Sequence, residues 1–91
     1  MKKFQDKVVW ITGSSSGIGE ATAYEFAKEG AKLILTALEA DLLQQVCKKC
    51  EELGSPKAEA LPFDLSQKDQ IAELAEKAWN VFGYIDVFYN N

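Results

Sequence analysis

Residues 8–19 read VVWITGSSSGIG, and this stretch decides the fold. It begins with a run of β-branched and aromatic residues, which is typical of a short buried strand. Gly13, Gly17 and Gly19 follow with the spacing G-x-x-x-G-x-G, and a helical pattern begins among them. A strand that leads through a glycine-rich turn into a helix is the arrangement that binds phosphate groups at a helix N-terminus.

Each glycine of this loop has a predicted physical role. Gly13 permits a tight turn directly after the strand, a side chain at Gly17 would block an approaching cofactor, and Gly19 lets the helix pack closely on the sheet. Free N–H groups and the positive end of the helix dipole then face a pyrophosphate. The cofactor contacts expected in the loop are Gly13, Ser15, Ser16, Gly17, Ile18 and Gly19. The alternative for such a loop is a turn without a ligand.

Downstream of the loop, β-rich runs alternate with amphipathic helical patterns. The predicted strands cover residues 8–11, 32–36, 58–63 and 85–89, with a helix between each pair. Ile18, Thr22 and Phe26 recur along the first helix with Ala21, Ala23 and Ala27 between them, which predicts a small, close-packing face, and Gly30 ends the helix. The second helix covers about residues 40–53, and Ser66 is the expected N-cap of the third.

This β-α-β-α-β-α-β order indicates parallel strands joined by right-handed crossovers. The expected fold class is α/β: the N-terminal half of a Rossmann-like doubly wound parallel sheet, with strand order 3-2-1-4. The first two helices should cover one face of the sheet and the third helix the other. Ligands bind beyond the carboxyl ends of the strands, at the switch point between strands one and four. We expect residues 1–91 to be the N-terminal portion of a single dinucleotide-binding domain that is truncated here.

Three motifs together carry a family resemblance. TGSSSGIG follows the first strand, Asp64-Leu65 follows the third, and Asn90-Asn91 follows the fourth. This combination resembles the short-chain dehydrogenase/reductase family over essentially all 91 residues. The resemblance implies that Asp64 accepts a hydrogen bond from the adenine amino group, with the Leu65 backbone beside it. It also implies that Asn91 lines the cofactor cleft and helps to fix the central sheet. Without the family pattern, Asp64 would be a loop or capping carboxylate and the asparagine pair a turn.

The end of the second strand bears on the choice between NAD and NADP. An acidic residue there hydrogen-bonds the ribose hydroxyls, whereas a basic residue attracts a 2′-phosphate. In the resembling family, users of NADP often have arginine at the place of Leu38 and users of NAD aspartate at the place of Ala37; this chain has neither. Glu39 comes one or two positions late and is expected to face solvent. Both cofactors stay open, with a slight preference for NADP, to which Thr36 and Leu38 are the candidate contacts.

The resemblance implies an NAD(P)-dependent oxidoreductase that acts on an alcohol or carbonyl compound. The family's catalytic serine, tyrosine and lysine lie after the region of Asn90-Asn91. We therefore expect no catalytic residue in this chain and no hydride transfer by the chain alone. Tyr24 and Lys28 fit the pattern Y-x-x-x-K, but they lie on the first helix, far from a bound nicotinamide. The alternative function is a non-catalytic dinucleotide-binding module.

Composition argues against several other classes of protein. The net charge is -4 and all 10 basic residues are lysines without a cluster, which argues against nucleic-acid binding. No apolar run approaches the roughly 20 residues that cross a bilayer. Cys47 and Cys50 fall inside a helical pattern and the chain has no histidine, so packing is expected rather than a metal or redox site. We expect a cytoplasmic homo-oligomer whose partners are a nicotinamide dinucleotide and a small substrate, with no metal, nucleic acid or membrane.

Overall fold

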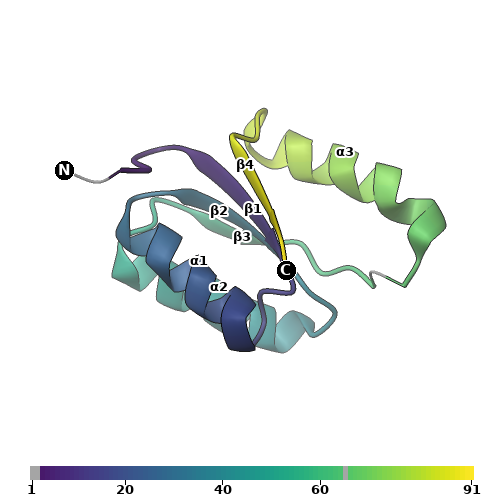
Figure 1. The fold of residues 1–91 in the computed structure, drawn as a ribbon, viewed down its shortest axis with the longest axis horizontal. Coiled ribbons are helices and arrows are strands. Elements are labelled where there is room, and N and C mark those ends of the chain that lie inside the picture. Colours follow the sequence, from purple (N-terminus) through teal and green to yellow (C-terminus); the bar gives the residue numbers. More distant parts are fainter. Residues whose placement is uncertain (1–2, 65) are drawn as a thin grey trace.

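The computed structural model describes residues 3–64 and 66–91. The elements are β1 (Val8–Thr12), α1 (Gly17–Lys28), β2 (Lys32–Thr36), α2 (Ala40–Leu53), β3 (Ala58–Ala60), the 3-10 helix η1 (Lys68–Gln70), α3 (Ile71–Phe82) and β4 (Val87–Asn90). Figure 1 traces this order from the purple N-terminal end to the yellow C-terminal end. All strand pairs are parallel and the strand order is β3-β2-β1-β4, so the expected fold class is confirmed.

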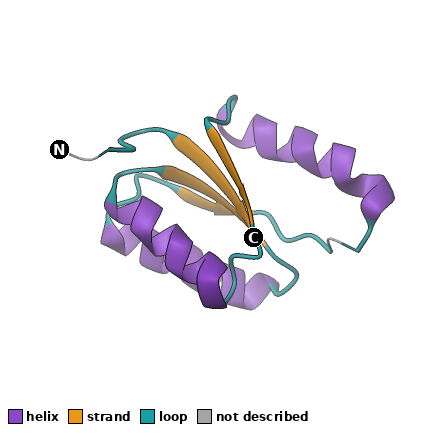
Figure 2. Cartoon of the chain, in the orientation of Figure 1, coloured by secondary structure: helices purple, strands orange, loops and turns teal. Residues whose placement is uncertain are grey.

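The two faces of the sheet are covered as the crossover rule predicts. Because side chains alternate along a strand, Val9 and Ile11 of β1 join the core that includes residues of α1 and α2. Val8 and Trp10 point the other way and pack with Leu74 of α3. Figure 2 shows α1 and α2 together on one side of the strands and α3 on the other.

The buried face of α1 is made of small residues, as the sequence predicts. The structure buries Gly19, Ala23 and Ala27, which recur every four residues. Ile18 lies outside this face and is 70% exposed. Small side chains let the helix axis approach the sheet closely.

The start of α3 differs from the prediction. Ser66 is not an N-cap: its backbone N–H and its hydroxyl both donate to Asp64 Oδ1, at 3.0 and 2.7 Å. The single turn of η1 follows, and α3 begins only at Ile71, with Gln70 in the capping position. The Asp64 side chain thus closes a turn of its own with Ser66, as short polar side chains commonly do, and the helix begins later.

Both later strands have ends that the pattern misplaced. β3 stops at Ala60 rather than at residue 63. The Phe63 N–H still donates to the Ala37 carbonyl at 3.0 Å, so the chain stays beside the path of β2. β4 begins at Val87 rather than at residue 85, because the Asp86 carboxylate accepts the Val8 N–H at 2.9 Å.

The two edges of the sheet differ in their protection. At the β3 edge, Glu51 Oε2 accepts the backbone N–H of Ala58 at 3.0 Å. β3 is also only three residues long, and short, charged edges resist strand addition. The β4 edge has no charged residue among Val87–Asn90, and Phe88 and Tyr89 are 53% and 38% exposed. The β4 edge is therefore the one that can accept another strand.

We expect the 91-residue chain to self-associate through this β4 edge. Sedimentation velocity over a range of protein concentrations should show a concentration-dependent shift away from the monomer. Tyr89→Lys should restore the monomer, because a lysine on an edge strand opposes pairing. Leu42→Lys, which adds the same charge at an exposed apolar position of α2, should leave the association unchanged. A native chain that stays monomeric and unfolds cooperatively at every concentration would contradict this expectation.

Candidate functional site

The predicted site residues converge at the carboxyl ends of β1, β2 and β4. The loop from Gly13 to Ser16 follows β1, residues 37–39 follow β2, and Asn91 follows β4. Figure 1 shows the C-terminus beside the connection between β1 and α1. This position is the topological switch point, where α/β sheets of this kind bind their ligands.

The glycine loop has the backbone geometry that its spacing predicts. Gly13 and Gly17 have φ of 65° and 60°, in the left-handed region that favours glycine. A Cβ at Gly19 would lie 1.9 Å from the Gly13 carbonyl oxygen, so the close packing of Gly19 is confirmed and the turn itself is its nearest neighbour. A Cβ at Gly17 would meet nothing within 4 Å. The space beside Gly17 is open, as the predicted approach of a cofactor requires.

The N-terminus of α1 has no side-chain cap. Ser16 occupies the N-cap position with φ -161° and ψ 169°, and its hydroxyl makes no capping hydrogen bond. The first N–H groups of a helix have no partner within the helix. The amides from Gly17 to Gly19 are therefore available to an anion, and the helix dipole adds positive potential at that point.

Ser14 holds the loop in place, although the sequence argument did not single it out. Its side chain is completely buried, and its hydroxyl donates toward the carbonyls of Ile11 and Thr36, each at 3.3 Å. Its backbone N–H also donates to the Thr36 carbonyl, at 3.3 Å. The end of β2 thus positions the start of the glycine loop.

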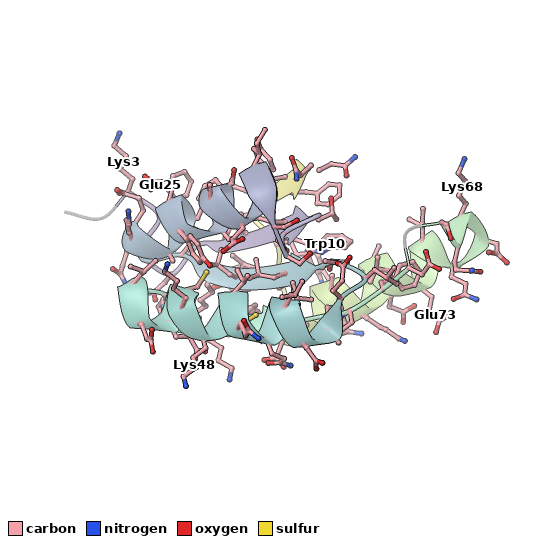
Figure 3. All side chains as sticks on the ribbon, turned by 90° about the horizontal axis from the view of Figure 1, so that it is seen from below. Lys3, Trp10, Glu25, Lys48, Lys68 and Glu73 are labelled. Atoms are coloured by element: carbon pink, nitrogen blue, oxygen red, sulfur yellow. The ribbon has the colours of Figure 1, made fainter. Side chains whose placement is uncertain are left out.

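Thr36 is enclosed on its other side by Trp10. The indole Nε1 of Trp10 donates to Thr36 Oγ1 at 2.9 Å, and Thr36 has no exposed surface. Figure 3 shows Trp10 within the body of the domain rather than at its periphery. Because Thr36 has no exposed surface, the predicted contact of its hydroxyl with a 2′-phosphate would require the surrounding residues to move. In the structure Thr36 supports the loop, through the carbonyl that binds Ser14.

Thr12 and the two asparagines join β4 to β1. Thr12 Oγ1 donates to Asn90 Oδ1 at 2.8 Å and accepts the backbone N–H of Asn91 at 3.2 Å. Asn91 Nδ2 donates to the Gly13 carbonyl at 3.2 Å. These bonds agree with the predicted role of Asn91 in fixing the central sheet, and its contact with a cofactor stays a prediction. Thr12 and Asn90 lie within the quoted TGSSSGIG and asparagine-pair motifs, but neither was a predicted contact residue.

Two carboxylates follow the neighbouring strands: Glu39 comes after β2 and Asp64 after the β3 segment. Glu39 is not directed only to solvent, because its Oε1 accepts a hydrogen bond from Ser15 Oγ at 3.0 Å. Asp64 is exposed, and the hydrogen bonds that it accepts from Ser66 lower its pKa. Asp64 is therefore ionised at neutral pH and presents an acceptor at the end of the β3 segment. Leu65, the backbone neighbour expected beside adenine, lies outside the described residues.

Two exposed apolar side chains border the same region. Ile18 at the start of α1 is 70% exposed and Leu38 after β2 is 64% exposed. Single exposed apolar residues are ordinary on protein surfaces. Their positions at the beginning of α1 and directly after β2 nevertheless give an apolar contact to any ligand that binds at this edge.

The Y-x-x-x-K pair on α1 has the wrong environment for catalysis. The Tyr24 hydroxyl donates to Glu20 Oε2 at 2.6 Å, and burial together with this carboxylate raises the pKa of Tyr24. Lys28 pairs instead with Glu25, at 3.2 Å. A catalytic tyrosine needs a lowered pKa near the working pH. The geometry gives Tyr24 the opposite shift.

The cysteines are packing residues, as expected. Cys47 and Cys50 are both buried and unbridged, and burial raises the pKa of each thiol to about 12. Such thiols stay protonated and unreactive at neutral pH. Over residues 3–64 and 66–91, no group of three or more potential ligands could hold a metal ion. In that same part of the chain, no helix has the length and apolar character to span a bilayer.

These features define a class of protein before any relative is considered. A parallel sheet whose glycine loop opens a helix at the switch point is the hallmark of dinucleotide-binding α/β domains. Comparison with known families then gives the identity: the family model for short chain dehydrogenase matches residues 7–91. The chain belongs to the short-chain dehydrogenase family.

Individual relatives agree with this family. The chain is 44% identical over 85 residues to 11-beta-hydroxysteroid dehydrogenase A of Sesamum indicum, an alignment that covers 93% of this chain and 24% of that protein. A short chain dehydrogenase from Mycobacterium smegmatis superposes with a TM-score of 0.89 at 26% identity, over 100% of this chain and 38% of that one. A metagenomic short-chain oxidoreductase solved in complex with NADP has a TM-score of 0.85 and 34% identity, over 93% and 38%. The chain therefore spans well under half the length of these relatives.

Proposed function

We propose that this chain supplies the cofactor-binding part of an NAD(P)-dependent oxidoreductase. The observation that carries the proposal is the Gly13–Gly19 contact, because it places an uncapped helix N-terminus beside an open space at the switch point. Such a helix end binds phosphate groups through backbone N–H donors. Membership of the short-chain dehydrogenase family supports the same function.

Different residues bind different parts of the dinucleotide in this proposal. The amides from Gly17 to Gly19, with the hydroxyls of Ser15 and Ser16, bind the diphosphate, and Ile18 and Leu38 contact the adenosine half. The ionised carboxylate of Asp64 accepts the adenine amino group, and Asn91 lines the cleft between β4 and the loop. A bound nicotinamide supplies the hydride donor or acceptor. The chain's own part is to bind and orient it.

The reaction belongs to the whole protein in this proposal. The substrate is a small alcohol or carbonyl compound, which the name of the Sesamum indicum hydroxysteroid dehydrogenase supports. Tyr24 and Lys28 do not serve as the proton donor and its partner, because Tyr24 is bound to Glu20 and its pKa is raised. We infer that residues 1–91 bind the cofactor without transferring hydride, and that the whole protein is a cytoplasmic homo-oligomer.

Calorimetric titration of the purified chain with NAD+ and NADP+ should show saturable binding of at least one dinucleotide. Gly17→Ala should reduce the affinity at least about tenfold, because the new methyl group would occupy the open space at the helix N-terminus. Gly83→Ala is the matched control. Gly83 has φ 85° and, like Gly17, has nothing within 4 Å of an added Cβ, so the two substitutions carry similar backbone strain.

The outcomes separate the two functions that the sequence left open. Gly83→Ala should bind as the native chain does, and equal loss in both variants would mean that strain, not blocked approach, is responsible. Turnover of a panel of carbonyl substrates by the 91-residue chain would contradict the proposed division of labour. Absence of binding for both dinucleotides would overturn the proposed function itself.

A further inference from the structure

The hydrogen bond between Ser15 and Glu39 joins two loops that are 24 residues apart. Ser15 lies in the glycine loop, and Glu39 is the N-cap residue of α2, directly after the β2 end. One carboxylate oxygen accepts the serine hydroxyl at 3.0 Å. A carboxylate has about four acceptor sites, so this bond leaves capacity for a ligand hydroxyl. The contact holds a negative charge at the place where the end of β2 meets a dinucleotide.

The charged side chains around Glu39, at the carboxyl ends of the strands, are all negative. The segments 12–19, 36–41 and 60–64, at the carboxyl ends of β1, β2 and β3, contain no lysine; the second and third contain carboxylates, and the chain has no arginine. Several lysines lie instead at the opposite ends of the strands, at Lys7, Lys32 and Lys57. Figure 3 shows Lys48 and Lys68 projecting from the periphery of the domain. A 2′-phosphate would bring close to two negative charges to these segments, and the segments contain no lysine or arginine to pair with it.

We propose that Glu39 is a specificity-determining residue, which makes the protein select NAD over NADP. This inference rests on the proposed cofactor site. The carboxylate, oriented by Ser15, accepts hydrogen bonds from the free ribose hydroxyls of NAD. The same charge is exposed and acts through solvent, so it repels the 2′-phosphate of NADP only where the two groups come within short range. This proposal runs against the slight preference for NADP that the strand-end pattern suggested; Glu39 is exposed, as expected, but its carboxylate is also held by Ser15.

The test is the ratio of the two dissociation constants, measured by calorimetry with NAD+ and NADP+ at one fixed salt concentration. The native chain should bind NAD+ at least about tenfold more tightly than NADP+, a difference of about 1.4 kcal/mol. Glu39→Gln, which keeps the shape and removes the charge, should reduce this ratio to about threefold or less, mainly through tighter NADP+ binding. Glu39→Lys should reverse the preference.

Asp41→Asn is the matched control, because it removes the same charge from the first turn of α2, two residues away. Its ratio should stay within about twofold of the native value. A native preference for NADP+, or equal changes of the ratio in Glu39→Gln and Asp41→Asn, would overturn the role of Glu39 while leaving the cofactor site intact. Failure of the native chain to bind either dinucleotide would instead overturn the proposed function, and this inference with it. Melting curves from circular dichroism establish that each variant is folded.

Discussion

Replacement of Gly19 by alanine should destabilise the chain by about 3 kcal/mol or more and abolish dinucleotide binding. The added Cβ would lie 1.9 Å from the Gly13 carbonyl oxygen and 2.8 Å from Asn91 Nδ2. The carbonyl belongs to the backbone and accepts a hydrogen bond from Asn91, so it cannot rotate away as a flexible side chain would. Relief of the clash must separate the helix from the turn, which dismantles the proposed phosphate site.

Urea denaturation followed by circular dichroism measures this loss, and calorimetry measures the binding. Whether the substitution lowers or raises the free energy of unfolding distinguishes a steric clash from the ordinary effect of alanine in a helix. At an ordinary interior position of a helix, the change from glycine to alanine would stabilise the fold by up to about 1 kcal/mol. Gly83→Ala gives the cost of backbone strain without a clash, because Gly83 has φ 85° and an added Cβ there meets open space. A Gly19→Ala chain as stable as the native one would show that the helix and loop can separate without loss.

The second large effect concerns the buried hydrogen bond between Trp10 and Thr36. Trp10→Phe keeps an aromatic ring beside Phe88, with which Trp10 now stacks at 4.6 Å, but removes the only donor to Thr36 Oγ1 in the described structure. Thr36→Val removes the acceptor and keeps the branched shape. Each single change leaves a buried polar group without its partner, which costs about 1–3 kcal/mol.

A double-mutant cycle isolates the contribution of the bond. The double variant Trp10→Phe/Thr36→Val leaves no orphaned group, so its free energy of unfolding should exceed the additive expectation by about 1 kcal/mol or more. Urea denaturation of the four chains supplies the values. Additivity within about 0.5 kcal/mol would mean that the indole and the hydroxyl do not support each other.

Much of the fold follows from local sequence. The order of strands and helices, the parallel strand order and the left-handed turn at Gly13 all follow from patterns within a few residues. One prediction that went wrong depended on an interaction between neighbours. Ser66 is a good N-cap by type, but the carboxylate two residues earlier forms a turn with its backbone N–H, and α3 begins only at Ile71.

The motifs of the candidate site were predicted from the sequence, but the hydrogen bonds between its loops were not. The glycine loop and Asn91 carry a spacing that a sequence shows directly, because backbone geometry requires particular residues there. Glu39 carries no such signal, since it lies one or two positions after the places where the family pattern has its cofactor-selecting residues. Only the folded loops show that its carboxylate meets Ser15.

The sequence by itself determined the elements, their parallel order and the loop that opens α1, because these depend on backbone preferences and on hydrophobic patterns within each segment. The tertiary structure alone decided which side chains complete the site. The bonds Ser15–Glu39, Trp10–Thr36 and Asn91–Gly13 join residues 24, 26 and 78 positions apart. No local pattern encodes such pairs, because each exists only when parallel strands bring their carboxyl ends to the same edge of the sheet.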